Sequence, residues 1–224
     1  SNATGFTVFK KEQYINGGQG NDSLIGNNEG NLLIGGNDND ILNGGKGNDV
    51  LYGNNRNSQT NNSDYIDIAV YSGTSNDYKV SRATDSTFGY VYYIQDTRDD
   101  SPDGLDTLYD IDKLRFSDGD FDIETYYQEK AGEGAGDDVI TGTPGDDLID
   151  GFGGDDTITG LAGDDILIGG DGDDVIDGGL GKNLIYGDAG NDTITSNGVG
   201  DVVDAGVGNN NITISSTSKS GKYI

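Results

Sequence analysis

The chain has 224 residues and a formal net charge of −27, and it contains neither cysteine nor histidine. This composition excludes disulfides, thiol chemistry, histidine metal sites and histidine-based acid–base catalysis, and the charge excludes nucleic acid and anionic membranes as natural partners. We expect Ser1–Ala3 to be an expression scar and, since there is no Met, the chain to be a piece of a larger protein. No apolar run approaches the ~20 residues that span a bilayer, so no membrane insertion is predicted.

A nine-residue phrase fills residues 17–53, after an initial strand or cap that we place at residues 4–16. Frames open at Gly17, Gly26, Gly35 and Gly44, and Gly53 begins a fifth frame that the next residues do not complete. The sixth residues of the complete frames are Asp22, Asn31, Asp40 and Asp49, and the eighth residue is Leu in every one. The leucines are typical of inward-facing strand positions, and the glycines supply turn conformations.

The middle of the chain has a different composition. Residues 54–63 are polar and typical of a linker, whereas residues 64–130 are rich in tyrosine and predict a β-rich inserted or capping domain. We predict half-buried antiparallel strands at 65–71, 78–82, 88–95, 108–116 and 121–126, and no helix anywhere. The repeat resumes at Glu133, and the offset of 116 residues from Gly17 is not a multiple of nine. We therefore interpret the segment as an interruption of the repeats, not as a decayed continuation of them.

The phrase then recurs nine times within a second block at residues 131–214, before a C-terminal tail at 215–224. Its clearest copy is Gly169–Asp177, and its eighth residue is always Ile, Leu or Val. Two phrases can form one coil of a solenoid, so that each phrase stacks on the next but one with strands ~4.8 Å apart. The sixth residues then form two ladders; they are Asp138, Asp147, Asp156, Asp165, Asp174, Asn183, Asp192, Asp201 and Asn210.

Such ladders need a cation. Two bare carboxylates ~5 Å apart repel by about 3 kcal/mol at an effective dielectric constant of ~20. A hard divalent ion between rungs makes the net interaction attractive, because it binds the carboxylate and turn carbonyl oxygens. We expect about nine ions as the upper estimate. We predict Ca²⁺ ligands at Asp22, Asp40, Asp49, Asp138, Asp147, Asp156, Asp165, Asp174, Asp192 and Asp201. Sites touching Asn31, Asn183 or Asn210 should be weaker, because an amide lacks the charge. The second block should depend on calcium more steeply, because five of its fifth positions are aspartates, namely Asp137, Asp146, Asp155, Asp164 and Asp173.

The phrase Gly-Gly-x-Gly-x-Asp-x-(apolar)-x resembles the hemolysin-type calcium-binding nonapeptide of the repeats-in-toxin (RTX) family, over residues 17–52 and 133–213. The resemblance implies an all-β fold, with a calcium-binding parallel β-roll in two blocks that flank an antiparallel β-rich segment. It also implies a secreted, extracellular or cell-surface location and a type I secretion apparatus as partner. The function that follows is a non-enzymatic module that folds on binding extracellular calcium and so serves secretion, folding and stability of the exported protein.

Other interpretations stay open beside this one. A calcium-dependent adhesin or polysaccharide-binding module is the main alternative, and a fragment of a polysaccharide-modifying enzyme is a weaker one, since no carboxylate pair stands out. Tyr90, Tyr92 and Tyr93 could stack on a sugar, although such residues more often pack in a core. The loop Asp96–Asp106 could hold one more calcium ion, but it lacks EF-hand spacing, which favours a solvated loop. Apolar seventh residues predict an outer face that contacts another domain or a second copy.

Overall fold

The computed structural model describes residues 13–54, 65–85, 88–100, 102–131, 134–214 and 222–223. Most of the predicted initial segment, linker and tail lies outside these residues. The chain divides into two compact units, one of residues 1–80 with 91–128 and the other of residues 81–90 with 129–224. Within the described ranges, no helix combines the length and apolar character that crossing a membrane requires.

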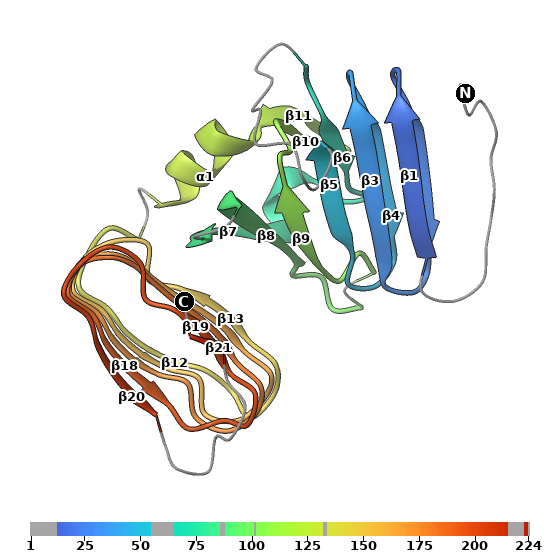
Figure 1. Ribbon diagram of the computed structural model, residues 1–224. Helices are drawn as coiled ribbons and strands as arrows, with labels where there is room; N and C mark the ends of the chain where they lie inside the picture. Colours follow the sequence, from blue (N-terminus) through green and yellow to red (C-terminus); the bar gives the residue numbers. More distant parts are fainter. Residues whose placement is uncertain are drawn as a thin grey trace. The chain divides into compact units, whose positions relative to one another are not determined.

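The first unit begins as a parallel roll of two sheets (Figure 1). Strands β1 (Gln13–Gln19), β3 (Asn31–Asn37) and β5 (Val50–Asn54) lie side by side in one sheet, and β2 (Ser23–Asn27) pairs with β4 (Ile41–Gly45) in the other. Ile15 faces Leu33 and Leu24 faces Leu42 in the register. Each phrase therefore stacks on the next but one, as predicted, and the leucines at the eighth positions are buried.

The roll continues into the middle segment, where we had predicted an interruption. Strand β6 (Ile68–Val70) pairs in parallel with β4, β9 (Leu105–Tyr109) with β5, and β10 (Lys113–Phe116) with β6. Ala69, Leu108 and Leu114 extend the inward-facing columns, because Ala69 pairs with Leu42 and Leu114, and Leu108 pairs with Leu51. Insertions lengthen these coils without breaking the stack, so the interpretation of a pure interruption is wrong.

Antiparallel strands are added around this extended roll. Strand β8 (Gly89–Asp96) runs antiparallel to β9 and neighbours β7 (Tyr78–Asp85), while β11 (Gly119–Asp122) runs antiparallel to β10. A short 3-10 helix at Ser75–Asp77 precedes β7. The single strand predicted at 108–116 is two strands, β9 and β10, because the chain turns at Asp110 with a φ of 51°. The segment is therefore mixed, with parallel pairs that join it to the roll.

One α-helix, α1 (Ile123–Ala131), corrects two predictions: that the chain has no helix, and that residues 121–126 form a strand. Asp122 starts it, since its Oδ1 accepts a hydrogen bond of 3.0 Å from the backbone N–H of Thr125. Ile123, Tyr126 and Tyr127 are buried, at the three- and four-residue spacing of one helix face. The aromatic residues suggested a strand, but their spacing belongs to a helix.

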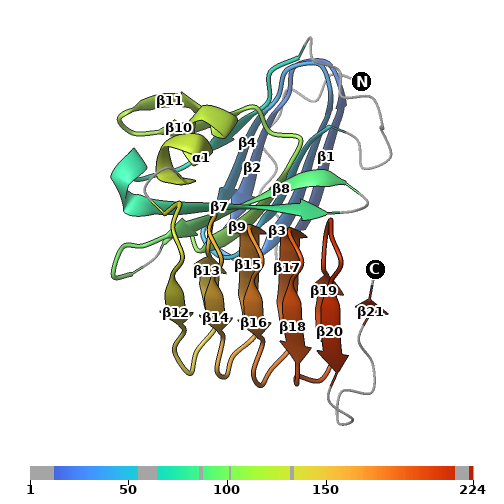
Figure 2. The same ribbon diagram turned by 90° about the vertical axis from the view of Figure 1, so that its left-hand side faces the viewer.

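The second unit contains a more regular roll (Figure 2). One sheet holds β12 (Val139–Thr141), β14 (Thr157–Thr159), β16 (Val175–Asp177), β18 (Thr193–Ser196) and β20 (Asn211–Ile214). The other holds β13 (Leu148–Asp150), β15 (Ile166–Asp171), β17 (Leu184–Ala189), β19 (Val202–Asp204) and β21 (Lys222–Tyr223). All pairs are parallel, and β21 adds two residues of the predicted tail to the roll. The predicted all-β parallel roll is confirmed.

The core of this roll is a column of eighth-position side chains, among them Ile158, Leu167, Ile176 and Ile185. The seventh residues mostly point outward, as expected: Val139 is 82% exposed, whereas Leu148 is an exception at 5%. Burial alternates along strands such as β14 and β16, and the sixth residue lies at the turn immediately before each strand.

Candidate metal site

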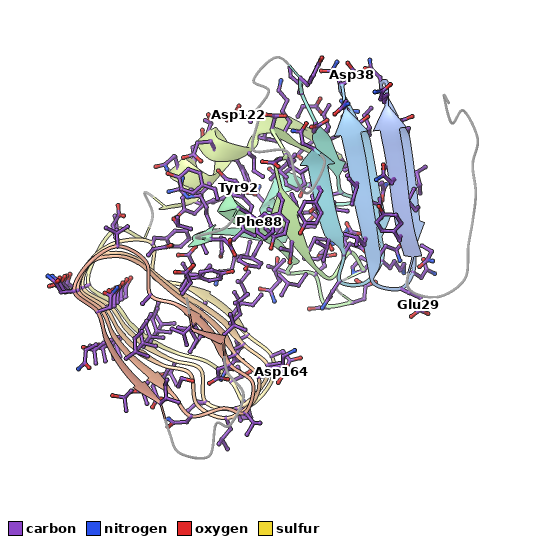
Figure 3. The ribbon with its side chains drawn as sticks, in the orientation of Figure 1. Glu29, Asp38, Phe88, Tyr92, Asp122 and Asp164 are labelled. Carbon is purple, nitrogen blue, oxygen red and sulfur yellow. The ribbon has the colours of Figure 1, made fainter. Side chains whose placement is uncertain are left out.

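The sixth residues form continuous ladders through hydrogen bonds between side chain and backbone. The backbone N–H of Asp22 donates to Asp40 Oδ1 at 2.8 Å, and that of Asp156 donates to Asp174 Oδ1 at 2.9 Å. The same bond, always to the sixth residue one coil further on, recurs through both rolls. Figure 3 shows side chains of the second roll superposed in rows, as this register requires. Asn can serve at this position because an amide oxygen also accepts the bond.

The second carboxylate oxygen, Oδ2, has no such partner at most rungs. It is buried and makes no hydrogen bond in seven of the ten predicted ligands: Asp22, Asp40, Asp49, Asp156, Asp165, Asp174 and Asp192. A buried carboxylate oxygen without a hydrogen bond or a cation costs free energy. A row of them at equivalent positions indicates a bound group that supplies positive charge.

Each Oδ2 faces a space that exists because the phrase opens with glycine. A Cβ built on Gly160 would lie 2.6 Å from Asp165 Oδ2 and 2.8 Å from the carbonyl oxygen of Gly178, one coil further on. At Gly17 the corresponding distances are 2.5 Å to Asp22 Oδ2 and 2.6 Å to the Gly35 carbonyl oxygen. Any side chain would fill this space. Carboxylate and carbonyl oxygens converging on one small volume are the ligands that Ca²⁺ prefers.

Carbonyl oxygens must contribute to such a site, because no three acidic side chains converge on one point among the described residues. Each cradle, meaning the space bounded by the opening glycine, the Oδ2 atom and the carbonyl of the next coil, brings one carboxylate. The residues present therefore fit a hard divalent cation, with Asp supplying charge and the turns supplying neutral oxygens.

Burial and neighbouring carboxylates oppose ionisation of these groups. Burial, with a smaller contribution from nearby aspartates, raises the pKa of Asp40 to about 6 and that of Asp49 and Asp174 to about 7. Burial likewise raises the pKa of other rungs, namely Asp156, Asp165 and Asp192. Without a cation, these carboxylates are held in an environment that favours their protonated form.

Three predicted ligands have a different environment. Asp147 Oδ2 accepts a bond of 2.7 Å from the backbone N–H of Thr143, and Asp201 Oδ2 accepts one of 2.6 Å from Ser196 Oγ. Asp138 is exposed, on the first coil of the second roll. These residues belong to the ladders, but none of them holds a buried oxygen that lacks a partner.

The asparagines also divide into two kinds. The side-chain N–H of Asn183 donates to the carbonyl of Gly178 at 2.9 Å, and that of Asn210 donates to Ala205 at 2.7 Å. In both, the amide nitrogen satisfies the carbonyl of the residue that opens its own phrase. Asn31 instead keeps Oδ1 toward Gly26, where that oxygen accepts a bond of 2.6 Å from Asn27 N–H.

Sequence reasoning missed Asp67 and Asp106, which continue the two ladders. The N–H of Asp40 donates to Asp67 Oδ1, and the N–H of Asp49 donates to Asp106 Oδ1, both at 2.8 Å. The signal was present as an aspartate two residues before an inward-facing apolar residue, Ala69 or Leu108. A search that allowed insertions within the phrase would have found both.

The alternative sites singled out in the middle segment are structural. Arg98 binds Asp96 through Nη2 at 2.6 Å and Asp103 at 3.2 Å, and Asp103 also accepts hydrogen bonds from Tyr78 and Ser72. A guanidinium therefore occupies the place that a cation would take in this loop. Tyr92 and Tyr93 are buried while Tyr90 is exposed, so the three tyrosines form no common stacking surface.

Comparison with known proteins agrees with this geometry. The model of the RTX calcium-binding nonapeptide repeat (4 copies) matches residues 14–36, 25–55, 134–167, 159–194, 168–203 and 181–212, together more than half of the chain. The chain belongs to this family. The RTX repeat is a structural calcium-binding module and not a catalytic family, and calcium is the ion that it binds.

No curated protein matches the chain. Among solved structures, the extracellular lipase LipA from Serratia marcescens is similar, with 18% sequence identity and a TM-score of 0.24. The match covers 90% of this RTX chain and 39% of the lipase chain, so the chain spans about two fifths of that protein's length.

Proposed function

We propose that this RTX chain is a calcium-driven folding module of a secreted protein, exported by a type I secretion apparatus and folded by extracellular calcium. The observation that supports it best is the row of buried Oδ2 atoms, six of which share their glycine cradle with a carbonyl oxygen of the next coil. In the bare chain these oxygens repel one another and lack partners. A calcium ion in each cradle would satisfy both oxygens and bridge successive coils.

Linkage makes this binding a switch. A site at a calcium concentration ~10-fold above its Kd contributes about 1.4 kcal/mol to folding, and a site at a concentration far below its Kd contributes almost nothing. Seven such sites contribute about 10 kcal/mol, which is comparable with the stability of a whole domain. At the Kd values near 10⁻⁴ M typical of extracellular modules, the change from cytosolic to extracellular calcium spans this range. The chain would then stay unfolded inside the cell and fold after export.

Far-UV circular dichroism during a calcium titration tests the proposal. We expect a cooperative gain of β-signal in the wild-type chain, and a transition at higher calcium in Asp174→Asn, which keeps the Oδ1 acceptor but removes the charge. Asp138→Asn is the matched control, because that carboxylate is exposed at one end of the ladder. A β-signal already complete in excess chelator would refute the proposal.

A further inference from the structure

Asp67, in a coil beyond the matched repeats, has the environment of a repeat aspartate. Its exposed fraction is 0%, and its Oδ1 accepts the bond of 2.8 Å from Asp40 N–H that continues the ladder. Its Oδ2 is buried without a hydrogen-bond partner, like those of Asp22 and Asp40. Asp67 lies outside the residues matched by the family model.

A glycine cradle surrounds this oxygen as well. A Cβ on Gly53 would lie 2.6 Å from Asp67 Oδ2 and would overlap the carbonyl oxygen of Asp110. One coil earlier, the same space above Gly35 is bounded by Asp40 Oδ2 and the Gly53 carbonyl. Gly53 therefore opens a fifth phrase after all, and Asp67 supplies its sixth residue after an insertion.

The carbonyl that closes this cradle comes from an irregular turn. Asp110 has a φ of 51°, in the left-handed region that a residue with a side chain seldom adopts. This turn between β9 and β10 replaces most of a phrase, yet it brings a carbonyl to the place that the phrase-opening residue supplies elsewhere. The shortened coil thus keeps both oxygens of the cradle.

We infer that Asp67 Oδ2 and the Asp110 carbonyl, above Gly53, hold a calcium ion in addition to those of the nonapeptide repeats. This inference rests on the proposed calcium function and extends it to the coils that close the first roll. The ion would connect Asp67, which follows the insertion after Gly53, to the turn before β10. Asp106, the corresponding residue of the other ladder, is also buried, but neither of its carboxylate oxygens is among the buried oxygens that lack a hydrogen-bond partner.

Native mass spectrometry of the full chain at saturating calcium tests this site by counting bound ions. We expect Asp67→Asn to bind one ion fewer than the wild type, since the change keeps the Oδ1 acceptor and removes the charge. Asp99→Asn is the matched control, because Asp99 is exposed in the same unit and takes no part in the ladder hydrogen bonds, so the control removes the same charge away from the proposed site. We expect it to keep the wild-type count.

The outcomes separate the two proposals. A wild-type chain that binds no calcium would overturn the proposed function, whereas equal counts in the wild type and a folded Asp67→Asn would overturn only the Asp67 site. Circular dichroism in calcium establishes whether the variant folds. If it does not, an anomalous difference map of wild-type crystals grown in calcium decides: a peak between Asp67 Oδ2 and the Asp110 carbonyl supports the site, and a water there excludes it.

Discussion

The two units contain the same repeat, but they differ in the additional core that packs around it. The core of the second roll is dominated by an aliphatic column at the eighth positions. The first unit adds an aromatic cluster in which Phe116 packs against Tyr78 at 5.0 Å and Tyr126 at 5.6 Å between ring centroids, together with helix α1. Aromatic burial stabilises a fold whether or not calcium is present. Dependence on calcium is therefore set by what surrounds the ladder as well as by the ladder itself.

The fifth positions increase this difference. In the second roll the first five of them are aspartates, which form an exposed acidic row with N–H groups that donate to the aspartate one coil earlier, as from Asp155 to Asp137 at 2.9 Å and from Asp173 to Asp155 at 2.9 Å. In the first roll the equivalent bond joins neutral Asn39 and Asn21 at 3.2 Å. The second roll thus carries more repulsion and less calcium-independent core.

The largest effect that we predict follows from this contrast. As calcium is lowered, the second roll should lose its structure at a higher calcium concentration than the first unit. Hydrogen exchange with mass spectrometry measures this by comparing amide protection in peptides from residues 139–214 with peptides from residues 65–128 across a calcium titration. Amide protection that appears in both regions at the same calcium concentration would contradict this prediction.

Acidification should act in opposite directions with and without calcium. The pKa of Asp49, Asp67 and Asp174 is raised to about 7 from an ordinary value of 3.8, so the folded state binds more protons than the unfolded chain between these limits. In chelator, where the proposed function leaves the chain largely unfolded, the equilibrium should therefore shift toward the folded state as pH falls from about 8 to about 5. In calcium the free energy of unfolding should fall instead, because protons compete for the ligands. The far-UV circular dichroism signal in EGTA and urea unfolding in calcium, each at both pH values, measure the two responses; shifts in the same direction would contradict the prediction.

Arg98→Ala should destabilise the first unit by about 3 kcal/mol, because it leaves the buried Asp96 and Asp103 carboxylates without their cation. Chemical unfolding in saturating calcium, followed by tyrosine fluorescence, measures the loss. Arg115→Ala is the matched control, since the Arg115–Asp120 pair is exposed and is expected to contribute less than about 1 kcal/mol. Similar losses in the two variants would show that the Arg98 cluster does not stabilise the first unit through its buried carboxylates.

The regular part of the fold could be predicted because it is encoded locally. Each phrase carries its own turn glycine, ladder residue and inward aliphatic residue, so period and chemistry together give register, core and the direction of stacking. The sequence did not show which ladder aspartates have their Oδ2 atom satisfied by a hydrogen bond. Asp147 and Asp201 have the same spacing as Asp174, but Thr143 and Ser196 supply hydrogen bonds that only the folded turn brings to their Oδ2 atoms.

The middle segment was misjudged because its repeat is separated by insertions. Asp67 completes the phrase that Gly53 opens, and the intervening residues hide the nine-residue period. Its register depends on pairing with β4, which is a tertiary contact and not a local pattern. Helix α1 was missed for a related reason: Tyr126 and Tyr127 favour strands by composition, whereas their burial follows helical spacing behind the Asp122 cap.

The smallest predicted effect concerns a single rung, Asn183. Its side-chain N–H satisfies the Gly178 carbonyl, while its Oδ1 accepts the Asp165 N–H at 3.0 Å. Asn183→Asp keeps the acceptor and places a second carboxylate oxygen beside the Gly178 carbonyl, which bounds the Asp165 cradle. We expect the variant to gain about 1.4 kcal/mol in saturating calcium through about tenfold tighter binding at that cradle, and to lose this gain at limiting calcium, where the added buried carboxylate is unsatisfied.

Urea unfolding at saturating and at limiting calcium measures both values. Asn191→Asp is the matched control, because Asn191 is exposed at a fifth position and gains the same charge without facing a carbonyl across a cradle. Its calcium response should stay close to that of the wild type. If Asn183→Asp changes stability equally at saturating and at limiting calcium, the amide does not weaken a calcium site, and this rung of the second roll's ladder is equivalent to its neighbours.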